Sequence, residues 1–173
     1  FVVSSASTGV LFAQITKGAP YDVFLSADAE HVDKLIDKGI AFSDSRRVYA
    51  RGQVVLWRKR SDAAQEAMSI RQLGERSTRY SIANPKLAPY GKAARSLMIK
   101  HQLWRESDRN RITAANIAGA FQYLASGAVN TGWVAYSQLK RWQLSHDVAP
   151  KDFWLPPIAD YPAIDQVAAV LTR

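Results

Sequence analysis

Short apolar runs alternate with stretches of helical periodicity along the whole chain. Strand-like runs are expected over residues 1–4, 21–26, 48–59, 80–83, 131–135, 152–154 and 165–171, with a further apolar run at 112–114. Helical patterns are expected over 9–17, 90–101, 116–125 and 137–142, between Asp28 and Gly39, and within a polar loop at 61–74. Strand-then-helix units of this kind predict an α/β fold with largely parallel strands.

Composition limits the possible classes of protein. The chain has 173 residues, of which 47% are hydrophobic, which is enough to bury a sizeable core. Since no apolar run approaches the roughly 20 residues of a membrane span, we expect no membrane insertion. Cysteine is absent, which excludes disulfides and thiolate metal sites.

The formal net charge of +8 raises the question of nucleic-acid binding. The basic residues are scattered, however, in groups such as Arg46-Arg47, Arg58-Lys59-Arg60 and Lys140-Arg141. The chain has neither a tract of five or more like charges nor an RNA-binding aromatic signature. We therefore expect a solvated basic surface and no nucleic-acid partner.

Three strand-to-helix junctions carry the candidate chemistry. They are Ser7-Thr8-Gly9, Pro89-Tyr90-Gly91 and Thr113–Ile117, and each opens a helical pattern. Taken singly, each is explained by ordinary helix capping. Together they would offer unpaired amides, the positive ends of helix dipoles and a Thr8 hydroxyl, which can hold an oxyanion without a counter-charged side chain.

Three sequence blocks, in this order, add a family resemblance. Residues 13–28 read AQITKGAPYDVFLSAD, residues 82–91 read IANPKLAPYG, and residues 116–135 read NIAGAFQYLASGAVNTGWVA. Together they resemble the periplasmic molybdate-binding family of ABC importers over nearly the whole chain. The resemblance implies a type-II periplasmic binding protein fold, in which two α/β lobes close on a ligand between them.

The resemblance also implies lobe boundaries. Lobe one would hold residues 1–55 and 164–173, and lobe two would hold residues 56–163. Residues 53–57 and 164–170 would connect the lobes. Relative to the family, we expect the chain to lack the first strand and the C-terminal helices, so that lobe one would be incomplete.

By resemblance, five residues form the oxyanion site. Thr8 matches a family Ser or Thr, and Ser7 and Gly9 lie beside it; Tyr90 and Ile117 match positions that contribute main-chain amides. Some members use a tyrosine hydroxyl where this chain has Ala135, and we expect the neighbouring Tyr136 to point away. The expected ligand is molybdate or tungstate, with no cofactor and no cation site.

The implied function is capture of this oxyanion in the periplasm and its delivery to an ABC permease and its ATPase, by a monomer that is not an enzyme. His31, His101 and His146 are not at metal-ligand spacing, and Asp22 and Asp28 are better explained by capping and structural hydrogen bonding than by acid/base chemistry. No G-x-S-x-G, Walker or Rossmann motif occurs. The alternatives are an oxyanion-sensing domain of a transcriptional regulator, a binding protein for another oxyanion such as sulfate, and an enzyme acting on a phosphorylated or sulfated compound.

Overall fold

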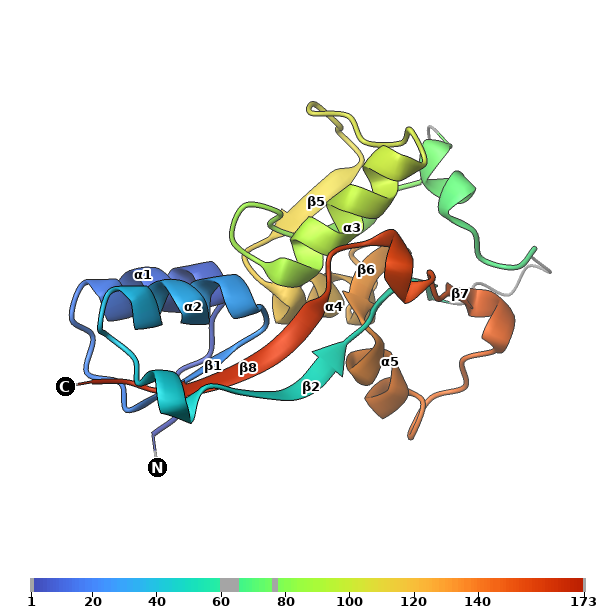
Figure 1. Cartoon of the computed structure of the whole chain (residues 1–173). Helices are drawn as coiled ribbons and strands as arrows, with labels where there is room; N and C mark the ends of the chain where they lie inside the picture. The colour runs from blue at the N-terminus through green and yellow to red at the C-terminus, as the bar shows by residue number, and fades with distance from the viewer. Residues whose placement is uncertain (1, 60–65, 76–77, 173) are drawn as a thin grey trace.

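The chain forms two β-sheets with helices packed on them (Figure 1). The computed structural model describes residues 2–59, 66–75 and 78–172. One sheet has three strands in the order β1-β8-β2, and the other has five in the order β5-β4-β6-β3-β7. The fold is α/β, as predicted.

The elements follow one another along the chain as strand-and-helix units. The α-helices are α1 (Thr8–Thr16), α2 (Ala29–Asp37), α3 (Pro89–Lys100), α4 (Ile117–Ala125) and α5 (Tyr136–Trp142). The strands are β1 (Val23–Ser26), β2 (Arg47–Gly52), β3 (Val54–Arg58), β4 (Tyr80–Ala83), β5 (Arg111–Ala114), β6 (Thr131–Ala135), β7 (Phe153–Trp154) and β8 (Ile164–Val170). Short 3₁₀ helices lie at Ser43–Ser45, Ile70–Gly74, Pro150–Asp152 and Ile158–Asp160.

The three-stranded sheet is covered by α1 and α2 on one face (Figure 1). Phe24 of β1 and Val167 of β8 point into this core against Leu35 of α2. On β1 the alternate residues Val23 and Leu25 are 53% and 60% exposed, because the period of a strand places them on the opposite face. An apolar cavity of about 780 Å³ lies beside them.

The five-stranded sheet is covered on both faces, which explains why its strands read as continuous apolar runs. On one side Val54 and Leu56 of β3 lie in the same core as Leu97 of α3. On the other side Val55 and Trp57 lie in a core with residues of α4 and α5. These four residues of β3 are buried, and the fifth, Arg58, is partly exposed.

Two predictions about strands were wrong. Residues 2–4 adopt no strand, and Val2 and Val3 are exposed, because no neighbouring strand in the described chain supplies a hydrogen-bonding partner. The sheets are also mixed rather than largely parallel: β4 pairs in parallel with β5 and β6, while the pairs β1–β8, β2–β8, β3–β6 and β3–β7 are antiparallel. The reason is that β8 and β3 run against the direction of the strands beside them.

The chain passes from one sheet to the other at two places. The predicted strand over 48–59 is divided at Gln53: Gly52 is the last residue of β2, and Val54 already pairs with Ala135 in the five-stranded sheet. The return passage ends at Ile164, which opens β8 and pairs with Gly52. The two passages therefore lie side by side.

The predicted helix within the polar loop at 61–74 is a 3₁₀ helix over Ile70–Gly74, and residues 60–65 lie outside the described chain. None of the described helices is long and apolar enough to cross a membrane.

Candidate functional site

The first junction places two buried hydroxyls at the start of α1. Ser7 is the N-cap residue and is only 6% exposed, yet its side chain makes no capping bond. Its Oγ has no hydrogen-bond partner among the described residues. Thr8 is 5% exposed, and its Oγ1 accepts a hydrogen bond from the Ala27 amide at 3.1 Å. A buried hydroxyl without a partner is costly, so Ser7 is a group that a ligand could satisfy.

Gly9 joins the first junction to the second. Its amide donates a hydrogen bond to the Leu87 carbonyl oxygen at 3.0 Å. A Cβ built on Gly9 would lie 3.0 Å from that oxygen, so glycine permits this close approach of the two loops. The Gly9 amide is therefore occupied in this structure, and its part in the site is to bring the junctions together.

The second and third junctions lie next to each other because β4 and β5 are parallel neighbours. Ala83 and Ala114, the last residues of these strands, are paired in register. The Asn84 amide donates to the Ala114 carbonyl at 2.8 Å, so that the turn before α3 lies against the end of β5. Helices α3 and α4 thus both begin at the carboxyl ends of strands in the five-stranded sheet.

The three helix starts leave amides without acceptors. Thr8, Tyr90 and Ile117 stand in the first two positions of helices of nine, twelve and nine residues. Within the described chain, the amides of Thr8, Tyr90 and Ile117 donate no hydrogen bond. Each helix dipole adds partial positive charge at its start. The arrangement offers hydrogen-bond donors and positive potential together, which suits an anion.

Outside the junctions, charged side chains connect the helices of the three-stranded sheet to those of the five-stranded sheet. Lys92 Nζ lies 3.3 Å from Glu30 Oε2, which joins α3 to α2, and Lys34 donates to the same carboxylate at 2.6 Å. Hydrogen bonds from Lys34 and then Lys92, together with their charges, lower the pKa of Glu30 to about 2. The bridge between the halves therefore stays ionised across the ordinary pH range.

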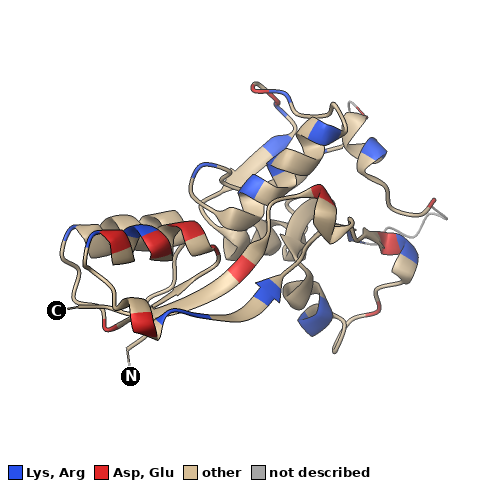
Figure 2. Ribbon diagram, viewed as in Figure 1, with Lys and Arg blue, Asp and Glu red and all other residues tan. Residues whose placement is uncertain are grey.

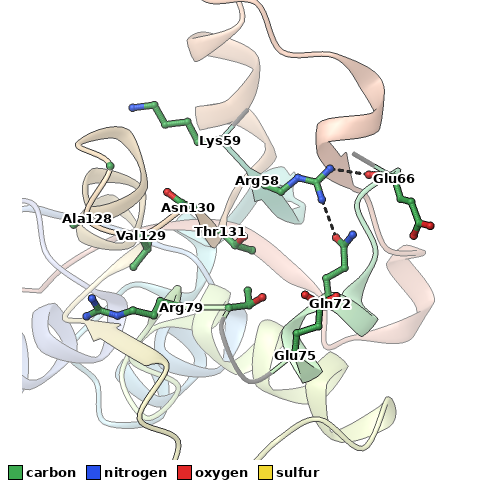
Figure 3. A pocket seen from close by; sticks show the side chains of 12 residues that line it. Arg58, Lys59, Glu66, Gln72, Glu75, Arg79, Ala128, Val129, Asn130 and Thr131 are labelled. Carbon is green, nitrogen blue, oxygen red and sulfur yellow. Dashed lines mark hydrogen bonds between the residues drawn. The ribbon is translucent and has the colours of Figure 1, made fainter. Parts of the chain in front are cut away.

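A polar cavity of about 540 Å³ lies at the opposite end of the five-stranded sheet, by the end of β3 and the start of β6 (Figure 3). Its Arg58 donates to Gln72 Oε1 at 3.2 Å and to the Glu66 carbonyl at 2.7 Å. Lys59 donates to the Ala125 carbonyl at 2.7 Å. These cations already have acceptors within the protein, in contrast to the donors at the junctions. Neither this cavity nor the apolar one is lined by the five predicted site residues.

Basic residues lie on many separate elements, and the acidic residues are interspersed with them (Figure 2). Among the described residues, no group of three His, Asp or Glu side chains could hold a metal ion. The His31 ring lies 2.9 Å from Asp28, whose carboxylate also accepts the His31 amide at the start of α2. The capping role predicted for Asp28 is confirmed.

Sequence reasoning missed two contacts around the first junction. It did not foresee that Leu87 accepts the Gly9 amide or that Ala27 donates to Thr8. Ala27 does stand at the end of the sequence block over residues 13–28, and this was the available signal in the sequence. Ala135 precedes α5, and the Tyr136 ring packs near Phe153, 6.2 Å between centroids, in the core shared by α4 and α5.

Known proteins share both the sequence and the fold. The chain is 34% identical over 173 residues to the molybdate-binding protein ModA of Azotobacter vinelandii, covering 99% of this chain and 67% of that protein. It is 36% identical over 150 residues to the molybdate-binding protein ModA of Rhodobacter capsulatus, covering 86% of this chain and 59% of that one. The chain therefore spans about two thirds or less of these relatives.

Solved structures agree. The Azotobacter vinelandii periplasmic molybdate-binding protein superposes with a TM-score of 0.86 at 32% identity, covering 98% of this chain and 73% of that chain. The sulfate-binding protein SubI of Mycobacterium tuberculosis shares the fold alone, with a TM-score of 0.70 at 12% identity over 96% of this chain and 63% of that one. The whole chain, residues 1–173, also matches the family described as bacterial extracellular solute-binding protein. The chain belongs to this family of bacterial extracellular solute-binding proteins.

Proposed function

We propose that the protein captures molybdate or tungstate outside the cytoplasm and delivers it to an ABC permease and its ATPase. It acts as a binding protein and not as an enzyme, and the oxyanion is its ligand rather than a cofactor. Two relatives at 34% and 36% identity that are named molybdate-binding proteins support this assignment, as does the superposition on a periplasmic molybdate-binding protein.

The observation that carries the proposal is the set of donors without acceptors at the junctions. The buried Ser7 hydroxyl and the amides of Thr8, Tyr90 and Ile117 all lack partners among the described residues. A tetrahedral dianion has four oxygens and needs donors on several sides, and three helix starts supply them together with their dipoles. Gly9 contributes by allowing the loops to approach rather than by donating.

Selectivity follows from the same chemistry. Main-chain amides can only donate, so they favour a fully deprotonated oxyanion over a protonated phosphate, which also needs an acceptor. Sulfate carries the same charge as molybdate but is smaller, so the size of the space between the helix starts discriminates between them. Molybdate and tungstate are alike in size and charge and both fit.

Binding is coupled to the relative position of the two lobes, residues 1–55 with 164–173 and residues 56–163. The hydrogen bond from Gly9 to Leu87 and the ion pair between Lys92 and Glu30 both join the lobes. We expect these contacts to form when the lobes close on the anion and to break when they open, so that the ligand shifts the population towards the closed form.

The test is calorimetric titration of the protein with molybdate, tungstate, sulfate and phosphate at a fixed ionic strength. Tight binding of molybdate and tungstate, with sulfate and phosphate at least about 100-fold weaker (a difference of about 2.7 kcal/mol), is the expected result. Preference for sulfate would reassign the protein to another oxyanion. Absence of binding to all four anions would refute the proposal.

A further inference from the structure

The side chain of Tyr90 packs into the core of the five-stranded sheet, whereas its amide belongs to the proposed site. The ring packs against the core shared by β3 and α3 and faces Gly52 at the end of β2. A Cβ built on Gly52 would overlap the Tyr90 hydroxyl and would lie 3.0 Å from the ring carbon Cζ. The tyrosine ring therefore occupies the space that a side chain at position 52 would take.

The backbone gives no other reason for glycine at position 52. Among the described glycines, only Gly18, Gly39 and Gly127 have a positive φ. Gly52 lies in a strand whose conformation any residue can adopt. Glycine is needed there because of the space that the ring of Tyr90 requires.

This space lies where the chain passes between the two sheets. Gly52 pairs with Ile164, and the same Cβ would lie 3.1 Å from Ile164 Cγ2. Gly52 ends the first passage on the side of the three-stranded sheet, and Ile164 ends the second. The ring of Tyr90 thus lies at Gly52, where the two connections pair, and in the same core as Ile164, while its amide lies at the start of α3 in the other lobe.

The surroundings of the ring are largely desolvated. Burial, and then the phenols of Tyr161 and Tyr49, raise the pKa of Tyr90. Tyr161 lies in the same core, three residues before Ile164. A buried aromatic ring held on several sides has few alternative positions, because protein cores are close-packed.

We propose that Tyr90 is a positioning residue for oxyanion binding, whose ring, held in the space at Gly52 between the two connections, fixes the start of α3 and its main-chain amide relative to the three-stranded sheet. This inference rests on the proposed function. It implies that position 52, although distant along the chain from the junctions, controls the affinity for the anion. It also implies that a residue larger than glycine at position 52 weakens anion binding by displacing the ring of Tyr90.

The test is a double-mutant cycle read as the Kd for molybdate. Gly52→Ala should raise the Kd roughly tenfold or more, because the displaced ring moves the amide of Tyr90 away from the anion. Tyr90→Phe removes the hydroxyl that overlaps most with the new methyl group. The double variant Gly52→Ala/Tyr90→Phe should therefore bind more tightly than Gly52→Ala alone.

The matched control is Gly74→Ala, because Gly74 also has an ordinary φ and, among the described residues, a Cβ there would meet only the flexible end of Leu103, at 3.2 Å. Its Kd should equal that of the wild type. A second variant, Tyr90→Ala, keeps the amide but removes the ring, and it should also bind roughly tenfold or more weakly. Thermal unfolding identifies the temperature at which every variant is folded.

Three outcomes would overturn the inference: Gly52→Ala binding as the wild type does, the double variant showing no recovery, or Tyr90→Ala retaining full affinity. If the wild type binds none of the tested oxyanions, the proposed function fails and the positioning role fails with it. Wild-type binding with unaffected variants refutes the positioning role alone.

Discussion

Replacing Ser7 with alanine should change stability and affinity in opposite directions. In the structure the Ser7 hydroxyl is buried, makes no capping bond and has no partner among the described residues. A buried polar group without a hydrogen bond costs about 1–3 kcal/mol. Because Ser7→Ala removes only that group, the free energy of unfolding without anion should rise by about 1 kcal/mol, or roughly 2–4 °C in Tm.

The same hydroxyl should donate to the bound oxyanion. A hydrogen bond to a charged group contributes about 1.5–3 kcal/mol, so the Kd for molybdate should rise about 10- to 100-fold. At a thousand times its Kd, an anion stabilises the wild type by about 4.1 kcal/mol, whereas a variant with a 100-fold higher Kd gains about 1.4 kcal/mol. The variant should therefore melt above the wild type without molybdate and below it with molybdate.

Thermal unfolding with and without molybdate, together with calorimetric titration, measures both effects. Ser5→Ala is the control, because Ser5 is exposed and should affect neither quantity. A Ser7→Ala variant that is less stable and binds molybdate as tightly as the wild type would show that Ser7 is a structural residue. That result would refute the reasoning from its unpaired hydroxyl.

Two further predictions concern the ion pair between α2 and α3 and a helix cap. Glu30→Gln removes the partner of Lys92 and should cost less than about 1 kcal/mol at pH 7, since the pair is exposed. The pKa of Glu30 in the folded protein is about 2, below its ordinary value of 4.5. The stabilisation by the ion pair is therefore present above pH 4.5 and is lost as the pH falls towards 2. A stability loss on Glu30→Gln that grows on acidification would contradict this. Asn116→Ala removes the acceptor of the Gly119 amide at 2.8 Å and should lower the free energy of unfolding by about 1 kcal/mol, as measured by denaturant titration. The control Asn130→Ala, at an exposed position, should leave the free energy of unfolding unchanged. Equal stability of the two variants would exclude the capping role of Asn116.

Helix starts and stops were predictable because they depend on local chemistry. Asp28 was expected to cap α2, and its carboxylate accepts the His31 amide. Gly39 was expected to end the same helix, and it adopts a φ of 67° just beyond the last helical residue. Such signals act over three or four residues, so they can be seen in the sequence itself.

Contacts between distant segments were not predictable from the pattern. Strands β1 and β2 pair with β8, which follows all five strands of the other sheet in the sequence. The first junction was expected to offer unpaired amides, but the amide of its Gly9 donates to Leu87, 78 residues along the chain. That the Ser7 hydroxyl has no hydrogen-bond partner in the described part of the chain is likewise a property of three-dimensional packing. No local propensity encodes these distances.

The position of β8 has a consequence for the order in which the two sheets can form. It is the middle strand of its sheet, and its neighbours β1 and β2 lie within residues 23–52. Those two strands therefore cannot form their sheet without β8, residues 164–170, whereas all five strands of the other sheet lie within residues 54–154. The five-stranded sheet can therefore form before β8 joins the structure, whereas β1 and β2 stay without their common partner until β8 lies between them, which makes their unpaired edges the sites most open to aggregation during folding.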